Sequence, residues 1–312
     1  MGVQNQPFLA ATQWQVQLSY QYGDTNDFYV GDQRDDAAAR FGVPPRRTVN
    51  LVNLDVVYGL SNRLSLDLTV PYASGSGAVM NGTNASHRIY EYRAQGLGDI
   101  SLQADYWLSN PARPSPVTGS VGLGVKAPTG SDSVQGTIPS PTGDVQGPID
   151  ETFQLGNGGW EILVRAQGTA QIVGPLFAYG SGYYGLSLNE KTDILERSAF
   201  LRGVPDTYSA RLGAAYLLPV LQGLVVSLGG RINGVTVRDI IGGGDLYWRR
   251  PGYEFFVEPG LTWTLGANSA SVSYPIRAYQ NKLDSLLDES RNVQVGAAFV
   301  PYLFLASYSR RF

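Results

Sequence analysis

Residues 13–22 read Gln-Trp-Gln-Val-Gln-Leu-Ser-Tyr-Gln-Tyr, so every even position is apolar or aromatic and every odd position is polar. Successive side chains of a β-strand point to opposite faces, and this stretch therefore predicts a strand with one apolar and one polar face. The same alternation recurs at residues 64–72 and 99–108. A pattern of period two that returns along the whole chain indicates an all-β fold.

Twelve segments show this alternation, and most are about as long as a tilted strand must be to cross a bilayer. We expect strands near residues 12–22, 47–60, 64–72, 98–108, 117–127, 160–172, 176–188, 206–218, 224–236, 253–265, 269–279 and 292–312. Short and long connections alternate between them, and short periplasmic turns with long extracellular loops are typical of outer-membrane barrels. The sequence thus predicts a single domain, residues 1–312, folded as a transmembrane antiparallel up-and-down β-barrel with both termini periplasmic. Residues 1–11 form its periplasmic lead-in.

A soluble β-sandwich or lipocalin-like barrel also alternates, but its apolar face points inward and fills a core. Two features argue against that alternative. The polar face carries many charges in mid-strand, and the apolar face ends repeatedly in Trp or Tyr, as the aromatic girdle of a membrane barrel does. The aromatic residues in the apolar sets are Trp14, Tyr22, Tyr58, Tyr72, Tyr106, Trp160, Tyr208, Trp263 and Tyr274.

The composition fits this location and excludes several classes of function. Charged residues make up only 16% of the chain, and there is no cysteine, which suits passage through an oxidising periplasm. The net charge of −3 gives no basic footprint for nucleic acid. No apolar run is long enough for a membrane helix. Without a signal peptide, Met1-Gly2 reads as an initiator added to a mature chain, and the expected location is the bacterial outer membrane.

The C-terminal segment 292–312 ends in Phe312, and a terminal Phe on an alternating strand resembles the sorting signal of outer-membrane proteins. Its apolar positions change from odd to even numbers around Pro301. A one-residue slip inverts the two faces of a strand, so we expect a β-bulge at Val300–Tyr302 that restores them. The alternative is a tight turn there, which adds a thirteenth strand.

Four short motifs resemble a family of outer-membrane proteins associated with meta-pathway degradation of phenol. They are Val70-Pro71-Tyr72, Gly96-Leu97-Gly98-Asp99, Gly124-Val125-Lys126-Ala127-Pro128-Thr129-Gly130 and Leu155-Gly156-Asn157-Gly158-Gly159, and the similarity covers roughly residues 50–190. The resemblance implies a barrel that passes small organic molecules, aromatic ones included. The same residues also have a purely structural interpretation, because Pro and Gly end strands and form turns.

Sorting each strand by face gives the residues expected to line the lumen. The acidic ones are Asp55, Asp67, Asp99, Asp105, Glu161, Glu254 and Glu258, and the basic ones are Lys126, Arg165, Arg211, Arg231 and Arg277. Acidic residues dominate the second to fourth strands and arginines the eighth and ninth, which lie almost opposite in a ring of twelve. Two interpretations of these charges stay open. Opposed walls of charge orient dipolar solutes in an open pore, or the charges neutralise one another as salt bridges in a crowded lumen. Long loops such as 128–159 can fold in and narrow the mouth.

Catalysis and metal binding are not expected, and no cofactor is predicted. Most enzymes of this class need a histidine as acid or base, and the chain has one, His87, in a loop without an orienting partner. Three hypotheses follow, in this order: a channel for passive or selective diffusion of small organic solutes, a structural barrel with a plugged lumen whose loops bind a partner, and an enzyme that depends on His87. Expected partners are outer-membrane lipid and a small-molecule solute, with a partner protein at the extracellular loops or on the periplasmic side under the second hypothesis.

Overall fold

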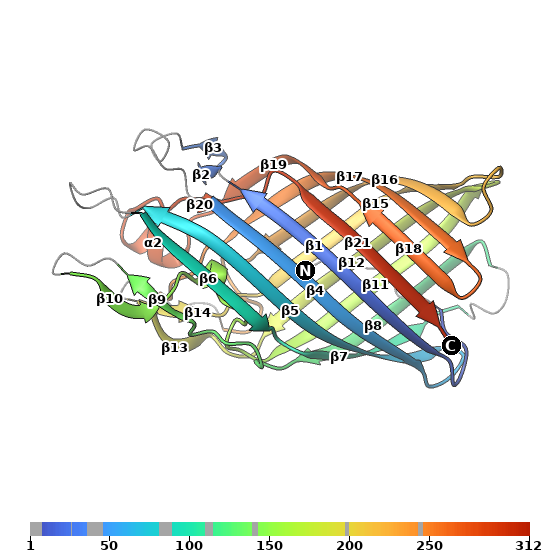
Figure 1. The fold of residues 1–312 in the computed structure, drawn as a ribbon, viewed down its shortest axis with the longest axis horizontal. Coiled ribbons are helices and arrows are strands. Elements are labelled where there is room, and N and C mark those ends of the chain that lie inside the picture. The colour runs from blue at the N-terminus through green and yellow to red at the C-terminus, as the bar shows by residue number, and fades with distance from the viewer. Residues whose placement is uncertain are drawn as a thin grey trace.

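The computed structural model describes residues 8–25, 27–35, 46–80, 89–109, 115–138, 143–196, 200–242 and 246–312. Its strands form a closed antiparallel barrel, which Figure 1 shows from the side as a long cylinder of tilted strands. The described wall has twelve strands, because β6 and β7 are two parts of one strand and β18 and β19 are two parts of another. The predicted fold class and strand number are confirmed.

In chain order the wall consists of β1 (Trp14–Thr25), β4 (Arg46–Gly59), β5 (Leu64–Met80), β6 (Ile89–Leu97) with β7 (Ser101–Trp107), β8 (Val117–Lys126), β11 (Glu161–Val173), β12 (Leu176–Ser187), β15 (Thr207–Leu217), β16 (Leu224–Val235), β17 (Gly252–Leu265), β18 (Asn268–Ser273) with β19 (Ile276–Lys282), and β21 (Leu303–Arg311). Each strand pairs with its neighbours in sequence. The barrel closes where β21 pairs with β1, from Gln15 opposite Arg311 to Gly23 opposite Leu303.

The two faces of the wall are those of a membrane barrel. On β7, Gln103 and Asp105 are buried, whereas the neighbouring Leu102 is 47% exposed on the outer face. On β1, Ser19 is buried and Leu18 is 54% exposed. An apolar outer face needs lipid around it, because water would penalise so large an apolar area. This arrangement rules out the soluble alternative, in which the apolar face fills the interior.

Small elements gather at the extracellular end of the barrel, opposite the C-terminus (Figure 1). They are the sheet of β2 (Phe28–Val30), β3 (Gln33–Arg34) and β20 (Ala297–Ala298), the hairpins β9 (Gln135–Ile138) with β10 (Val145–Pro148) and β13 (Lys191–Glu196) with β14 (Phe200–Gly203), the 3₁₀ turn η1 (Glu151–Phe153), and the helix α2 (Leu286–Ser290). None of the helices in the described ranges has the length and hydropathy to span a membrane.

The segment at residues 73–97, expected to be a loop, is largely strand. β5 continues to Met80, and β6 returns antiparallel to it, from Leu97 opposite Tyr72 to Ile89 opposite Met80. The alternation is weak here because this hairpin extends beyond the lipid, where no apolar outer face is required. Between β6 and β7 the ladder is interrupted at residues 98–100, next to Pro71, which has no N–H to donate.

The expectation of one bulged strand over 292–312 is wrong. The twelfth strand of the wall begins at Leu303, and Ala297–Ala298 pairs instead with β2 in the small extracellular sheet. Pro301 separates the two, and its carbonyl accepts a hydrogen bond of 2.9 Å from the Arg277 N–H. The change from odd to even apolar positions therefore marks two separate elements, and the strand count stays at twelve with a periplasmic C-terminus.

Candidate functional site: the barrel lumen

A large cavity lies inside the barrel beneath the extracellular loops, with a volume of about 520 Å³. Inward-facing residues of β1, β4, β5, β7, β8, β11, β12, β15 and β16 line its wall, and residues at 151–157, 202–205 and 249–250 line it from the extracellular side. The lining mixes charged side chains with apolar ones, among them Leu51, Leu155 and Leu163. We call this space the outer cavity.

A second cavity, of about 420 Å³, lies at the periplasmic end, and we call it the inner cavity. Its lining is different in chemistry, because β1, β17, β18 and β21 contribute a nearly continuous row of uncharged polar side chains. They are Gln15, Gln17, Ser19, Gln21, Thr262, Thr264, Ser269, Ser271, Ser273, Ser307 and Ser309. The charged members of this lining are Arg211, Arg231 and Arg311. No carboxylate belongs to it among the residues that the structure describes.

Three residues line both cavities: Gln15 and Gln17 on β1, and Asn53 on β4. The two spaces therefore meet along this part of the wall. All three side chains are uncharged amides, which can donate and accept hydrogen bonds. A solute that passes from one cavity to the other moves along these amides.

The chain before β1 turns back into the periplasmic end of the barrel. Phe8 lines the inner cavity and packs edge-on against Trp107, with ring centroids 6.3 Å apart. The turn is fixed because the Thr12 N–H donates to the Gly59 carbonyl (2.8 Å) and Leu9 is buried. This segment narrows the inner end of the lumen.

The twelve charged residues expected in the lumen are distributed unequally. Asp55, Asp67, Asp99, Lys126, Glu161 and Arg165 line the outer cavity, and Arg211 and Arg231 line the inner one. The remaining four, Asp105, Glu254, Glu258 and Arg277, line neither of these two cavities. Their action on a solute stays a prediction.

On one side of the lumen, two carboxylates share one guanidinium. Arg165 on β11 donates from Nε to Asp105 (3.1 Å), pairs with the same carboxylate through Nη2, and lies 3.4 Å from Asp67. Asp55 on the adjoining strand is held by neutral groups, accepting hydrogen bonds from Thr69 (2.7 Å) and Gln17 (3.3 Å). This wall, formed by β4, β5, β7 and β11, therefore holds three carboxyl groups and one guanidinium.

On the opposite side, two guanidiniums share one carboxylate. Arg231 donates to Glu258 through Nε (2.6 Å) and Nη2 (2.9 Å), and Arg211 lies 3.5 Å from the same carboxylate. This wall, formed by β15, β16 and β17, carries an excess of positive charge. Salt bridges thus pair charged side chains on both walls, and acidic and basic groups are unequal in number on each wall. The choice between the two interpretations stays a prediction.

The four motifs singled out in the sequence meet at one place, beside the interruption between β6 and β7. The Asp99 carboxylate accepts hydrogen bonds from the Gly130 N–H (3.0 Å) and the Asn157 N–H (3.1 Å). Thr129 donates to the Gly98 carbonyl (2.9 Å). Both ends of the loop 128–159 are therefore fastened to the barrel wall.

Lys126 completes this junction from the end of β8. Its Nζ lies 2.7 Å from Glu161 Oε1 and 3.4 Å from Asp99 Oδ2, and all three side chains are buried. Asn157 also donates to Glu161. These contacts support the structural interpretation of the motifs: they position the loop that covers the outer cavity.

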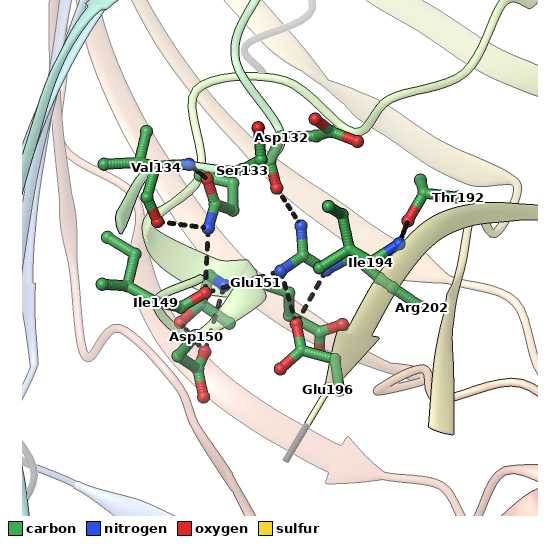
Figure 2. A network of polar contacts seen from close by, with 12 residues as sticks. Asp132, Ser133, Val134, Ile149, Asp150, Glu151, Thr192, Ile194, Glu196 and Arg202 are labelled. Atoms are coloured by element: carbon green, nitrogen blue, oxygen red, sulfur yellow. Dashed lines mark hydrogen bonds and ion pairs between the residues drawn. The ribbon is translucent and has the colours of Figure 1, made fainter. Parts of the chain in front are cut away.

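The same loop is held at its middle by arginines from other parts of the chain. Arg250, just before β17, donates to both oxygens of Asp150 at 2.9 and 2.6 Å, and its Nε lies 3.4 Å from Glu151. Figure 2 shows Arg202 of β14 directed toward Glu196 and toward the backbone carbonyls of Asp132 and Ile149. The loop is therefore a cover fixed by the partly buried pairs of Arg250 and by hydrogen bonds from Arg202 to its backbone.

Apolar packing holds the outer side of this cover. Tyr92 and Ala94 of β6 form a small buried cluster with Ile149 and Phe153. Phe153 also packs on the backbone of β5 at Gly77, where a Cβ would overlap its ring. The cover is thus bound on one side to the β5–β6 hairpin and on the other to the arginines.

The carboxyl groups in the cover, and Glu196 of β13 beside it, respond to burial and to these arginines in different ways. Burial raises the pKa of Glu151 to about 7, since desolvation of the carboxylate outweighs the attraction of Arg250. Burial likewise raises the pKa of Glu196. Burial acts in the same direction on Asp150, but the charge and hydrogen bonds of Arg250 hold the pKa of that carboxyl well below its usual range.

Sequence reasoning missed several residues of the lumen. Gln15, Gln17 and Asn53 are uncharged, whereas the predicted lining consists of charged side chains only. Arg249 and Arg250 lie in a loop, where the alternation of a strand cannot predict which way a side chain points. The available signal was the run Trp248-Arg249-Arg250-Pro251, two adjacent charges in a chain that has few.

His87, on which the enzyme hypothesis depends, lies outside the described residues. Within the described ranges, no three His, Asp or Glu side chains are grouped as the ligands of a metal ion would be.

No protein-family model matches the sequence, and no curated protein matches it. The crystal structure of an outer membrane channel from Pseudomonas putida F1 matches with a TM-score of 0.64 and 15% sequence identity, over 100% of both chains. This chain has the fold of an outer-membrane channel. That whole-chain likeness agrees with the predicted barrel and with a place in the bacterial outer membrane.

Two further solved structures are more distant. A FadL homologue from Pseudomonas aeruginosa has a TM-score of 0.45 at 8% identity, over 96% of this chain and 90% of that one. The translocator domain of the autotransporter NalP from Neisseria meningitidis has a TM-score of 0.47 at 13% identity, over 97% and 90%. These likenesses are too low to support an argument about this outer-membrane barrel.

Proposed function

We propose that the protein is an outer-membrane channel through which small organic solutes diffuse passively or selectively. The observation that carries this proposal is the pair of cavities inside the lumen, one under the loops and one at the periplasmic end. They share Gln15, Gln17 and Asn53 in their linings. Together they offer a series of spaces along the barrel rather than a filled core.

The chemistry of the two cavities supports a class of solute. The outer cavity presents apolar side chains such as Leu51 and Leu163 beside charged groups, and the inner cavity presents hydroxyls and amides. A partly apolar outer cavity followed by a polar inner cavity suits a small molecule with an apolar body and a polar group.

The charged residues act in this proposal as a lining. Arg165 with its two carboxylates and Glu258 with its two arginines leave opposite residual charges on the two walls. Rings of charge set selectivity in pores. We therefore assign the twelve lumen residues to solute selection and to the rigidity of the lining, with no enzymatic role.

A second candidate function is a structural or interaction barrel whose loops bind a partner protein while the lumen stays closed. One observation favours it: the loop 128–159 is fixed by the partly buried Arg250–Asp150 ion pair and by an apolar cluster. A loop held this firmly is also expected of a plug that closes the lumen. The two functions differ in whether solute passes.

Conductance and solute flux separate the two. Purified protein in planar bilayers is expected to give discrete conductance steps, and proteoliposomes are expected to swell in solutions of small neutral solutes. A folded protein without either, in which loop deletion abolishes partner binding, would instead establish the interaction barrel. Folding is checked by the slower migration of heated samples in gel electrophoresis.

A further inference from the structure

One carboxyl group in the outer cavity differs from the others that line it. Five carboxyl groups belong to the described lining, and four of them have an ion pair: Asp67 with Arg165, Asp99 and Glu161 with Lys126, and Glu151 with Arg250. The fifth, Asp55 on β4, forms no ion pair with any residue that the structure describes.

Asp55 is held in place by neutral groups. Thr69 donates to its Oδ1 at 2.7 Å, and Gln17 donates to its Oδ2 at 3.3 Å. Hydrogen bonds donated to both oxygens favour the ionised form of a carboxyl group. Arg165 acts on Asp55 without forming an ion pair, because its guanidinium is engaged by Asp105 and Asp67. The carboxylate is therefore fixed in position, and no cation of the described residues is bound to it.

Asp55 can also be reached from the cavity. It is only partly buried, whereas Asp67, Asp99 and Glu161 have no more than 6% of their side chains exposed. A carboxylate oxygen that accepts one hydrogen bond keeps a lone pair for a further donor. A donor in the cavity can therefore contact Asp55 without displacing the groups that hold it.

The surroundings of Asp55 suit an organic cation. On the inner face of β4, the alternate residues Leu51, Asn53, Asp55 and Val57 all line the outer cavity. Residues two positions apart on one face of a strand are about 7 Å apart, so a small molecule can contact the carboxylate and an apolar side chain together. Burial of its hydrocarbon part favours an organic cation over a hydrated metal ion.

We propose that the outer cavity binds small organic amines, and that Asp55 is the residue that contacts their ammonium group. The inference rests on the proposed function, because it names the class of solute that the channel retains on its way through the lumen. An ammonium group donates up to three hydrogen bonds and forms strong charge-assisted contacts with carboxylates. Asn53 offers an amide oxygen as a further acceptor, and Val57 packs against the hydrocarbon part.

Equilibrium binding in a non-ionic detergent tests this without requiring an open path. The probes are butylammonium and 1-butanol, which match in shape and differ in charge. The readout is saturation transfer from the protein to the methyl protons of each probe, corrected with protein-free micelles. Butylammonium is expected to bind to the wild-type protein more strongly than butanol. Asp55→Asn is expected to weaken butylammonium binding about tenfold, as loss of a charge-assisted contact does, and to leave butanol binding unchanged.

The matched control is Asp193→Asn, which removes the same charge from an exposed position on β13. Asp55→Glu is expected to recover part of the butylammonium binding. Equal binding of the two probes to the wild type, or an equal loss in Asp193→Asn, overturns the proposal. Complete displacement of butylammonium by an equal concentration of potassium also overturns it, because the site would then take any cation.

Binding and conductance separate this inference from the channel function. Butylammonium binding through Asp55 in a protein without conductance leaves the site in place and contradicts the channel function. Conductance without butylammonium binding does the reverse.

Discussion

Arg250 and Asp150 form a double hydrogen-bonded ion pair, with donor–acceptor distances of 2.9 and 2.6 Å, although 100 positions separate them in the sequence. Asp150 caps the start of η1 in the loop 128–159, and Arg250 lies two residues before the first residue of β17. Bidentate pairs of this geometry are the strongest of the charge-assisted hydrogen bonds. The pair therefore fixes the middle of the cover to the far side of the barrel.

Removing this pair is expected to loosen the cover. Arg250→Ala leaves Asp150 and Glu151 without their main counter-charge. The pair is only partly buried, so the loss lies below the cost of about 3–5 kcal/mol for breaking a fully buried pair. We expect a higher single-channel conductance and more frequent opening in planar bilayers. Arg238→Ala, on an exposed loop, is the control and is expected to behave as the wild type. An unchanged conductance in a folded Arg250→Ala protein means that the cover does not limit the path.

The cover is also expected to respond to pH between about 5 and 8. The pKa of Glu151 is raised to about 7 in the docked loop, so the docked state binds a proton more tightly than the released state. Docking is therefore strongest at pH values below the ordinary range of a glutamate and weakens as the pH rises through about 7. Conductance is expected to rise from pH 5 to pH 8.

The pH response has a direct control. Glu151→Gln is expected to conduct at pH 8 as the wild type does at pH 5, with a smaller remaining response from Glu196, whose pKa is raised in the same direction. The double variant with Glu196→Gln is expected to lose most of the response in this range. The lowered pKa of Asp150 places its titration below this window. A conductance that falls as the pH rises contradicts the assignment.

Two glycines on β5 offer a matched steric test. A Cβ on Gly77 would overlap the ring of Phe153, whereas a Cβ on Gly75 would lie 3.9 Å from the same ring. Gly77→Ala is expected to displace η1 and raise the conductance, and Gly75→Ala is expected to leave it unchanged. Hydrogen exchange at residues 151–155 measures the displacement directly. Equal exchange in both variants means that Phe153 does not hold the cover.

Asp99 is expected to matter for stability more than for selectivity. Its carboxylate accepts two backbone N–H groups from opposite ends of the loop 128–159 and faces Lys126. Asp99→Ala leaves these buried donors unsatisfied, at about 1–3 kcal/mol each. We expect a lower midpoint in urea unfolding from lipid vesicles. Asp193→Ala, at an exposed position on β13, is the control, and an equal midpoint for the two variants rules out this role.

The sequence was sufficient for the barrel because lipid imposes a strict rule on every strand. Leu18, Leu102 and Leu212 face outward since the membrane requires it, and this alternation is visible without any partner. Beyond the lipid no apolar outer face is required, and the sequence pattern did not predict the structure there. The β5–β6 hairpin and the small sheet with β20 lie at the extracellular end, and there strand length and pairing depend on contacts between distant segments.

The candidate site was predictable in part for the same reason. The inward direction of Asp67, Arg165 or Arg231 follows from strand parity. Their pairing does not, because it depends on side-chain lengths and on the stagger between strands. The role of Asp99 was harder to predict, because its hydrogen-bond partners Gly130 and Asn157 belong to a loop whose path no sequence periodicity indicates.

Accessibility of the lumen wall tests the central claim, a solute path through both cavities. The chain has no cysteine, so a single Cys reports on one position only. Asn53 lines both cavities, and its neighbour Leu54 is 42% exposed on the lipid face. In planar bilayers, a charged thiol reagent is expected to reduce the conductance of Asn53→Cys and to leave Leu54→Cys unchanged. Equal responses of the two variants, or folded proteins that do not conduct, would contradict a path along the shared wall.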